Sequence, residues 1–332
     1  MKPAIITLDA AIQKLKSAKR VLITSHARAD GDALACVAAM QRVLRAQGHA
    51  AQGYLHEKVG DRYEFVTEVE PLRIWEPGRA AAPLAEHDML LVVDTCAAVQ
   101  LGDVAGAIGD AKLAKLAVDH HITRDGIVDE AFVDEAAGAC AQLVLRICEE
   151  AGWQVDGDTA TLLFSGLATD TGWFRFSNAD AAVFADAERL IAAGARPNEL
   201  YERLFLCEIL PRIRLMGEVM STFELLADGR LAIVRVTRDM LARCGATTQM
   251  TEDIINEPQR LGSVVACAMI TEPEPGEPVR VSMRSKREID VAKLASAWGG
   301  GGHARAAGAK IRGDYETAVA TVTQAMLAAI KA

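Results

Sequence analysis

The chain has 332 residues, more than one hydrophobic core usually holds, and this length favours two domains. Hydrophobic residues make up 51% of it, which is ample for a globular fold, and no apolar run reaches the roughly 18 residues of a membrane span. The net charge of −9 excludes a broad electrostatic grip on long duplex nucleic acid. It is compatible with a short anionic substrate held by metal ions and a few arginines.

The cysteines and the first residues indicate a cytoplasmic protein. The seven cysteines are an odd number, and no two of them have CxxC spacing. Scattered cysteines of this kind are typical of reduced, buried thiols. The first seven residues continue into an amphipathic helix pattern rather than a signal peptide, so we expect no membrane partner.

Strands and helices alternate through the first half of the chain. Short apolar runs predict buried strands, and apolar residues three and four positions apart predict helices. In chain order these segments are a strand at 21–25, a helix at 34–44, strands at 89–93 and 116–118, and helices at 139–151 and 159–168. The alternation predicts an α/β fold, with helices on both faces of a parallel sheet.

Four polar clusters directly follow apolar elements of this half. They are His26, Asp30 and Asp32 after the first strand, Asp94 after the second, Asp119, His120 and His121 after the third, and Asp170 after the last helix. Parallel sheets bind ligands at the carboxyl ends of their strands, so we expect the clusters to converge there. One such cluster is more often structural than functional, but four in the same kind of place are hard to explain by coincidence.

Imidazole nitrogens and carboxylate oxygens are suitable ligands for divalent ions. Two such ions about 3.5–4 Å apart can clamp a phosphoryl group and activate a bridging water as nucleophile. Two coordination shells need about six or seven protein ligands, with one carboxylate shared. The sequence offers that number in His26, Asp30, Asp32, Asp94, His120 and Asp170.

Residues 119–121, Asp-His-His, resemble the signature of the DHH phosphoesterase family. Other segments resemble further motifs of this family and of the DHH-associated C-terminal domain. These segments are 26–32, Asp94 and 169–172 in the first half, and 284–286, 299–303 and 306–308 in the second. The resemblance covers nearly the whole chain and is nearest to the nanoRNase/pAp phosphatase (NrnA-like) branch.

The resemblance implies a role for each candidate residue. The implied ligands are His26 and Asp30 for one ion, Asp32, His120 and Asp170 for the other, and Asp94 as the bridge. His121 would contact the scissile phosphate and stabilise developing charge or protonate the leaving oxygen. Asp119 would support the site by orienting a ligand histidine. The mixed ligand shell and the family favour two Mn²⁺ ions, with Mg²⁺, Co²⁺ and Zn²⁺ as alternatives.

The sequence departs from the family pattern at three places. Ala29 stands where a proline is common, Ala35 and Cys36 stand where a Gly-Ser pair is common, and Gln100 stands where an arginine often follows the second motif. The small residues preserve helix packing, so the metal ligands are unaffected. The missing arginine bears on substrate preference instead.

The second half predicts a smaller α+β domain joined by a helical linker. Strand runs at 223–227 and 231–234 flank Asp228-Gly229, which is a hairpin signal. Further segments are strands at 261–270 and 279–283, a helix at 289–298, and linker helices at 181–193 and 199–216. The predicted division is a DHH catalytic domain at 1–190, a linker at 191–218 and a substrate-binding domain at 219–332.

Residues 299–302 are four consecutive glycines, which leave backbone N–H groups open to an approaching anion. A glycine run alone is more often a flexible loop, but His303 and Arg284 shift the interpretation toward phosphate binding. The resemblance also implies that Arg284 and His303 contact a terminal phosphate of the substrate. The candidate substrate-binding residues are Arg284, Ser285, Gly300, Gly301, Gly302, His303 and Arg305.

Two groups of aromatic and histidine residues lie outside these motifs. Trp173 and Phe174 follow Asp170 closely, so one of them is a candidate for lining a substrate cleft. A cleft between the two domains would admit short substrates and exclude long ones. His49, His56 and His87 lack acidic neighbours in motif spacing and are expected at the surface.

These observations predict a divalent-metal-dependent phosphoesterase. Its substrates would be short oligoribonucleotides (nanoRNA), the 3′-phosphate of 3′-phosphoadenosine 5′-phosphate, or both. A second enzymatic interpretation is a phosphodiesterase for cyclic dinucleotides or linear pApA, and a non-enzymatic one is a metal-dependent nucleotide-binding protein. Long duplex nucleic acid is not expected as a partner, and a homodimer is compatible with the sequence.

Overall fold

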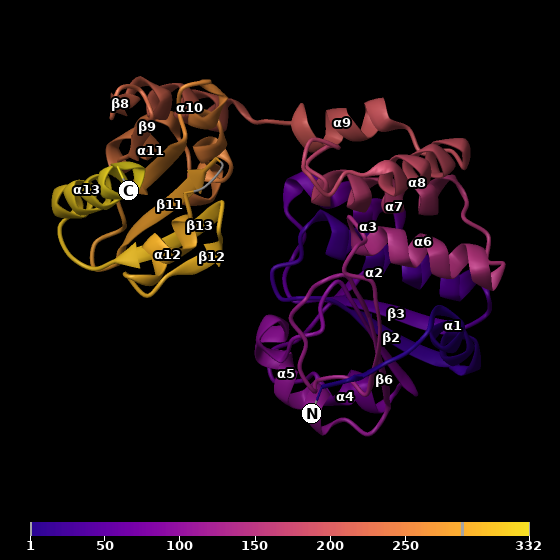
Figure 1. The fold of residues 1–332 in the computed structure, drawn as a ribbon. Coiled ribbons are helices and arrows are strands. Elements are labelled where there is room, and N and C mark those ends of the chain that lie inside the picture. Colours follow the sequence, from indigo (N-terminus) through magenta and orange to yellow (C-terminus); the bar gives the residue numbers. More distant parts are fainter. Residues whose placement is uncertain (1, 287–288, 332) are drawn as a thin grey trace. The chain divides into compact units, whose positions relative to one another are not determined.

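The computed structural model describes residues 2–286 and 289–331 and divides into two compact units, Met1–Cys207 and Glu208–Ala332 (Figure 1). The division falls within the stretch 191–218 that the sequence assigns to a linker. The helix expected at 199–216 is wrong as a single element, because α9 (Pro197–Phe205) ends in the first unit and α10 (Leu210–Ser221) begins the second. Pro211 explains the break, since proline lacks an N–H and clashes with the preceding helical turn.

The first unit is built on a seven-stranded sheet in the order β1-β7-β6-β5-β2-β3-β4. Every neighbouring pair of these strands is parallel, which confirms the predicted α/β class. The strands are β1 (Ala4–Ile5), β2 (Arg20–Thr24), β3 (Ala50–Leu55), β4 (Arg73–Ile74), β5 (Met89–Val93), β6 (Ala114–Asp119) and β7 (Glu130–Val133).

Helices cover both faces of this sheet, as the continuous burial of its central strands β2 and β5 requires. Ile23 and Leu91 pack into the larger core, whereas Leu22 and Leu90 point into a second core on the opposite face. Figure 1 shows α2, α6 and α7 on one side of the sheet and α4 and α5 on the other. The helices are α1 (Leu8–Ser17), α2 (Gly31–Ala46), α3 (Glu64–Val69), α4 (Ala81–Ala85), α5 (Ala105–Asp110), α6 (Cys140–Ala151), α7 (Gly157–Asp170) and α8 (Ala181–Ala192).

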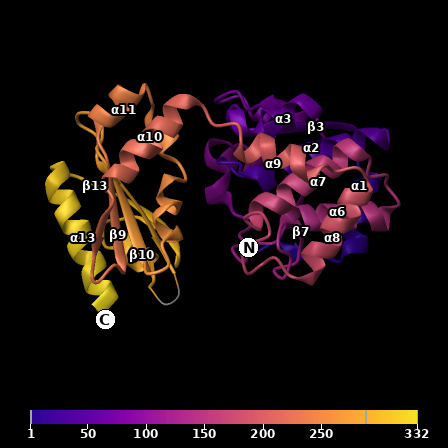
Figure 2. The same ribbon diagram turned by 90° about the horizontal axis from the view of Figure 1, so that it is seen from above.

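The second unit holds a six-stranded mixed sheet in the order β12-β13-β11-β10-β9-β8. Its strands are β8 (Glu224–Leu226), β9 (Leu231–Val236), β10 (Ala266–Thr271), β11 (Val279–Ser285), β12 (Gly301–His303) and β13 (Ala306–Ile311). β9 and β10 run parallel, and the other neighbours are antiparallel. Figure 2 shows α13 (Tyr315–Lys331) along one face and α10 with α11 (Arg238–Cys244) on the other.

The sequence predicted a hairpin and a strand boundary in the second unit, and the structure confirms the first and corrects the second. The hairpin around Asp228-Gly229 is confirmed, because β8 and β9 pair antiparallel across it. The strand expected at 261–270 begins only at Ala266, because Val264 N–H closes a turn onto the carbonyl of Leu261 at 3.1 Å. Within the described ranges, no helix is long and apolar enough to cross a membrane.

Candidate metal centre

The carboxyl ends of three adjacent strands bring the predicted ligands together. β2, β5 and β6 are neighbours in the sheet. His26 lies in the loop after β2, Asp94 directly follows β5, and His120 directly follows β6. Since all three strands are parallel, these side chains reach the same edge of the sheet.

Asp94 combines a strained backbone conformation with a buried carboxylate. Its φ angle of 60° lies in the left-handed region, which is uncommon for a residue with a side chain. The carboxylate is 2% exposed, and its Oδ1 makes no hydrogen bond within the described ranges. A strained backbone and an unpaired buried oxygen at one residue indicate a carboxylate held for a ligand.

Asp94 lies between two groups of donor atoms. Its Oδ2 is 3.5 Å from Nε2 of His26, and its Oδ1 is 3.4 Å from Nε2 of His120. Among the described residues, three sets of donor atoms lie within 4.8 Å of one another. They are His26, Asp30 and Asp94; Asp32, His120 and Asp170; and Asp94, His120 and His121. Because its two oxygens face different histidines, the Asp94 carboxylate is placed to bridge two cations.

The first turn of α2 directs its two aspartates differently. Asp30 is the N-cap, and its Oδ1 accepts hydrogen bonds from the N–H groups of Asp32 and Ala33, each at 3.1 Å. Asp32 is 1% exposed, and its carboxylate accepts from the N–H groups of Cys140 at 2.5 Å and Ala141 at 3.0 Å. The N-terminus of α6 therefore stabilises the buried charge of Asp32.

Gly166 in α7 leaves the space that the Asp32 carboxylate occupies. A Cβ atom at Gly166 would lie 2.6 Å from Asp32 Oδ1 and 3.1 Å from the Cβ atoms of Ala35 and Ala141. Two backbone N–H groups hold the Asp32 carboxylate in place and the other two neighbours are Cβ atoms, so a methyl group here displaces the carboxylate.

We expect Gly166→Ala to weaken Mn²⁺ binding by roughly 10–100-fold, because it moves Asp32 without removing any ligand. Isothermal titration calorimetry measures the dissociation constant. Gly106→Ala is the matched control, since Gly106 lies in α5 of the same unit and a Cβ there meets nothing within 4 Å. Equal affinities for the two folded variants would contradict this role for Gly166.

The two histidines of the signature are oriented by different partners. Nδ1 of His120 lies 3.1 Å from the carbonyl of Ala137, which leaves its Nε2 facing the carboxylates. Nδ1 of His121 lies 2.8 Å from Asp119 Oδ1, which also accepts the backbone N–H of His121 at 3.1 Å. Asp119 is fully buried and is therefore placed to orient His121 rather than a ligand histidine.

The crowding of carboxylates perturbs their ionisation. Burial and the charge of Asp94 raise the pKa of Asp32 well above its usual value, and burial raises the pKa of Asp170 to about 6. Burial would lower the pKa of His120, but Asp94 and Asp170 raise it to about 10. Burial would raise the pKa of Asp94, but the neighbouring imidazoles of His120 and His26 lower it. A bound cation would replace these protons.

The metal-free protein is expected to lose stability as pH rises from about 4 to 6, through the Asp170 window, and again from about 6.5 to 10, through the His120 window. Asp170 has a folded pKa of about 6 against a usual 3.8, and His120 one of about 10 against 6.5. Both groups hold protons more tightly when folded, so their stabilisation is lost as pH rises through each window. Calorimetry with a chelator should show Tm falling, and Asp170→Asn should flatten the first part of the fall. A Tm that rises across this range would contradict the account.

Three histidines lie outside the predicted motifs. His49, His56 and His87 are each partly exposed and partly buried. Each donates a ring N–H to a backbone carbonyl, of Ala18, Ser25 and Pro83 respectively. His56 is the one that matters here, because its partner Ser25 precedes His26. This pairing joins the end of β3 to the metal loop, and no motif spacing reveals it.

Gln100 contributes to the loop that carries His26. Its carbonyl accepts the N–H of Ala27 at 2.7 Å, and its side-chain Oε1 accepts the hydroxyl of Thr95. Gln100 therefore links the loop after β2, which carries His26, to the segment after β5.

The candidate phosphate contacts of the second unit occupy three adjacent strands. The backbone positions Arg284, Ala306 and His303 are paired across β11, β13 and β12. The side chain of His303 lies outside what the structure describes. Arg284 is half-buried, and its Nε donates to Asn256 Oδ1 at 3.2 Å.

The remaining candidates of this unit have local partners. The hydroxyl of Ser285 donates to the carbonyl of Ile289 at 2.5 Å, and Arg305 donates to the same carbonyl at 2.9 Å. The glycine run is partly a strand rather than an open loop, because Gly301 and Gly302 belong to β12. A Cβ at Gly300 would collide with the carbonyl of Gly308, so glycine is needed there for backbone packing. Gly301 has open space around it.

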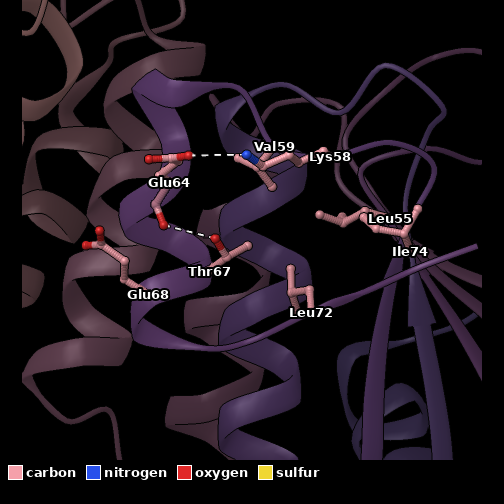
Figure 3. A pocket seen from close by; sticks show the side chains of 8 residues that line it. All are labelled: Leu55, Lys58, Val59, Glu64, Thr67, Glu68, Leu72 and Ile74. Atoms are coloured by element: carbon pink, nitrogen blue, oxygen red, sulfur yellow. Dashed lines mark hydrogen bonds and ion pairs between the residues drawn. The ribbon is translucent and has the colours of Figure 1, made fainter.

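A pocket of about 390 Å³ lies beside the end of β3 (Figure 3). Leu55, Val59, Leu72 and Ile74 give it apolar walls, and Lys58 pairs with Glu64 at 3.6 Å on its polar side. It contains none of the predicted ligands. Its carboxylates make it unsuitable for a phosphate.

Known proteins resemble this chain along nearly its full length. The model of the DHH family N-terminal domain matches residues 20–167, and that of the DHHA1 domain matches residues 232–332. A bifunctional oligoribonuclease and PAP phosphatase, NrnA of Thermus thermophilus, is 28% identical over 316 residues, covering 92% of this chain and 89% of that protein.

Two solved structures share the fold. An exopolyphosphatase-related protein from Bacteroides fragilis superposes with a TM-score of 0.90 at 21% identity, covering 96% of this chain and 94% of that one. RecJ of Thermus thermophilus, solved in complex with Mn²⁺, has a TM-score of 0.56 at 14% identity. The match to RecJ covers 98% of this chain and 55% of that one.

Proposed function

The chain belongs to the DHH family, with a DHH domain followed by a DHHA1 domain, and from this premise we propose that it hydrolyses short oligoribonucleotides and 3′-phosphoadenosine 5′-phosphate. It is a metal-dependent phosphoesterase. The relatives named as bifunctional oligoribonucleases and PAP phosphatases support the choice of substrates. The observation that carries the proposal is the Asp94 carboxylate, whose two oxygens face two separate sets of donor atoms.

The donor atoms suit a pair of divalent cations, with His26 and Asp30 on one, Asp32, His120 and Asp170 on the other, and Asp94 on both. Asp94 Oδ1 is buried and makes no hydrogen bond within the described ranges, and a bound cation would give this oxygen a partner. Two bound cations supply a nucleophilic water at neutral pH and neutralise the phosphoryl oxygens. The mixture of imidazole and carboxylate ligands favours Mn²⁺ over Mg²⁺, which prefers oxygen ligands alone.

His121 is the protein group assigned to the leaving oxygen. Asp119 holds its Nδ1 at 2.8 Å, so the opposite ring nitrogen, Nε2, is the one left to meet a phosphate. The Asp119 hydrogen bond raises the pKa of His121, which favours the protonated ring. A protonated imidazole stabilises charge on the phosphate and donates a proton to the departing oxygen.

The second unit is proposed to bind a terminal phosphate of the substrate. The residues assigned to this task are Arg284, Ser285, Gly300, Gly301, Gly302, His303 and Arg305. Arg284 and Arg305 are the strongest of them, because guanidinium groups pair with phosphate oxygens in bidentate fashion. The hydroxyl of Ser285 already donates to backbone carbonyls and shares the carbonyl of Ile289 with Arg305, so its contribution is to hold the backbone beside Arg305.

A hydrolysis panel with Mn²⁺ tests the proposal. It compares a dinucleotide, a pentanucleotide RNA, 3′-phosphoadenosine 5′-phosphate and cyclic di-AMP at equal concentration. We expect turnover of the first three, with a chelator and a parallel Asp94→Asn preparation as controls for contaminating nucleases. Turnover of cyclic di-AMP alone would favour the cyclic-dinucleotide interpretation. Turnover of none, with Mn²⁺ still bound, would overturn the proposal and leave a metal-dependent nucleotide-binding protein.

A further inference from the structure

The segment 172–176 follows Asp170 and has a strained backbone. Gly172, Trp173 and Phe174 have φ angles of 57°, 57° and 60°, so three consecutive residues are left-handed. Side chains rarely adopt this conformation, and two adjacent aromatic residues in it are costly. Strain of this kind persists only where the surrounding structure enforces it, and it gathers at functional sites.

The strained turn directs two aromatic rings into the first unit. The ring centroids of Trp173 and Phe174 lie 6.1 and 5.6 Å from that of Phe164, and Trp173 also meets Phe205 at 5.5 Å. Trp173 N–H donates to the carbonyl of Ala168 at 2.6 Å. These two residues are anchors, which argues against the expectation that one of them lines a substrate cleft.

The same turn holds a third aromatic ring outward. Phe176 is 56% exposed, and its N–H donates to the carbonyl of Thr171 at 3.0 Å. Its ring lies against Gly172, where a Cβ atom would be 2.5 Å from ring atom Cε2. A single exposed apolar side chain is ordinary, but this ring packs against the strained turn that carries it and presents its remaining surface to solvent.

The residue directly before Phe176 in the chain, Arg175, carries a positive charge. Arg175 is exposed, and its Nε donates to the carbonyl of Gly172 at 2.7 Å. Across residues 2–286 and 289–331, its two terminal nitrogens have no protein partner. Asn178 donates to the carbonyl of Asp170 at 3.2 Å and to that of Gly138 at 2.9 Å, which ties the segment back to the proposed metal ligand.

We propose that Phe176 and Arg175 form a nucleotide subsite beside the metal centre, with Phe176 stacked on the base next to the scissile phosphate and Arg175 on a phosphate oxygen. This proposal rests on the proposed function and narrows its substrate class to phosphoesters that carry a base. Stacking accepts every base, so the subsite selects nucleotides without selecting sequence. Base-free substrates such as polyphosphate gain nothing from Phe176.

The test compares a dinucleotide with its analogue that lacks the base beside the scissile phosphate. Phe176→Leu keeps an apolar side chain without a stacking face, so we expect its KM for the dinucleotide to rise by on the order of 10-fold. Its kcat, its Mn²⁺ affinity and its KM for the abasic analogue should match the wild type. Phe176→Tyr retains a stacking ring, so its KM for the dinucleotide should equal that of the wild type. Arg175→Gln should raise KM for both substrates.

Ile191→Ala is the matched control, because Ile191 is an apolar residue of the same unit that is 47% exposed and lies in α8, outside this segment. Its KM for the dinucleotide should equal that of the wild type. The subsite is overturned if an active protein with Phe176→Leu keeps the wild-type KM, or if KM rises equally for the abasic analogue. It is also overturned if the variant loses kcat together with Mn²⁺ affinity, which is the sign of a structural role. A wild type inactive on both substrates overturns the proposed function and the subsite together.

Discussion

Replacing Asp94 by asparagine is expected to lower kcat by on the order of 10³-fold or more, because both sets of donor atoms depend on this carboxylate. Asparagine preserves the shape of the side chain but removes its charge and one of its two ligand oxygens. The bridge between His26 and His120 is then lost, and with it the neutralising charge between two cations. Steady-state kinetics and equilibrium dialysis with Mn²⁺ measure the two effects, and we expect Mn²⁺ binding to weaken as well.

Asp125→Asn is the control for this substitution. Asp125 is a half-buried aspartate of the same unit, and its carboxylate accepts the N–H groups of Ala98 at 2.7 Å and Ile127 at 3.1 Å. The single amide oxygen of asparagine can accept one of these bonds, and Asp125 belongs to none of the sets of donor atoms. We expect it to retain wild-type kcat. Full activity in a folded Asp94→Asn protein would refute the bridging role.

His121→Ala is expected to lower kcat by about 10²–10⁴-fold while both Mn²⁺ ions stay bound, because His121 acts on the phosphate rather than on the metals. Nδ1 of His121 is 3.7 Å from Asp94 Oδ1 but only 2.8 Å from Asp119 Oδ1, so its closer partner is the orienting carboxylate. Single-turnover kinetics and metal analysis of the same preparation separate the two roles.

Asp119→Asn provides an independent check on His121. The hydrogen bond and charge of Asp119 raise the pKa of His121, so removing that charge lowers it again. The ring then loses its proton at lower pH, and the alkaline limb of the kcat profile should move to lower pH. Loss of one bound Mn²⁺ in His121→Ala, with no change in the profile of Asp119→Asn, would make His121 a ligand instead.

The sequence was informative where chemistry and topology coincide. Buried strand runs such as 89–93 indicate a parallel sheet, and a parallel sheet gathers the residues that follow its strands at one edge. For that reason the α/β class and the group of candidate ligands could be predicted together. His26, Asp94 and His120 are distant in sequence, yet each occupies the same position relative to its strand.

What the sequence did not reveal depends on contacts between distant helices. The bonds from Asp32 to the N-terminus of α6 span 108 and 109 positions, and nothing local in either segment predicts them. The space that Gly166 leaves for Asp32 is likewise visible only once α7 is packed on α2. Phe176 was missed because the more conspicuous Trp173 and Phe174 precede it and carry the same apolar character.

The second unit shows the limits of compositional signals. The glycine run predicts freedom of movement, but the structure uses Gly302 in an edge strand because a Cβ there would lie 2.5 Å from the carbonyl of Ala306. The apolar stripe at 199–216 predicts one helix, and Pro211 divides it. In both cases the backbone, rather than the side chains, decides the outcome.

Anomalous diffraction at the manganese edge, from crystals grown with Mn²⁺, tests the central claim most directly. We predict two peaks about 3.5–4 Å apart, each coordinated by one oxygen of Asp94. One peak should lie beside His26 and Asp30, and the other should lie beside Asp32, His120 and Asp170. A single peak, or two peaks with no Asp94 oxygen between them, would contradict the two-metal account.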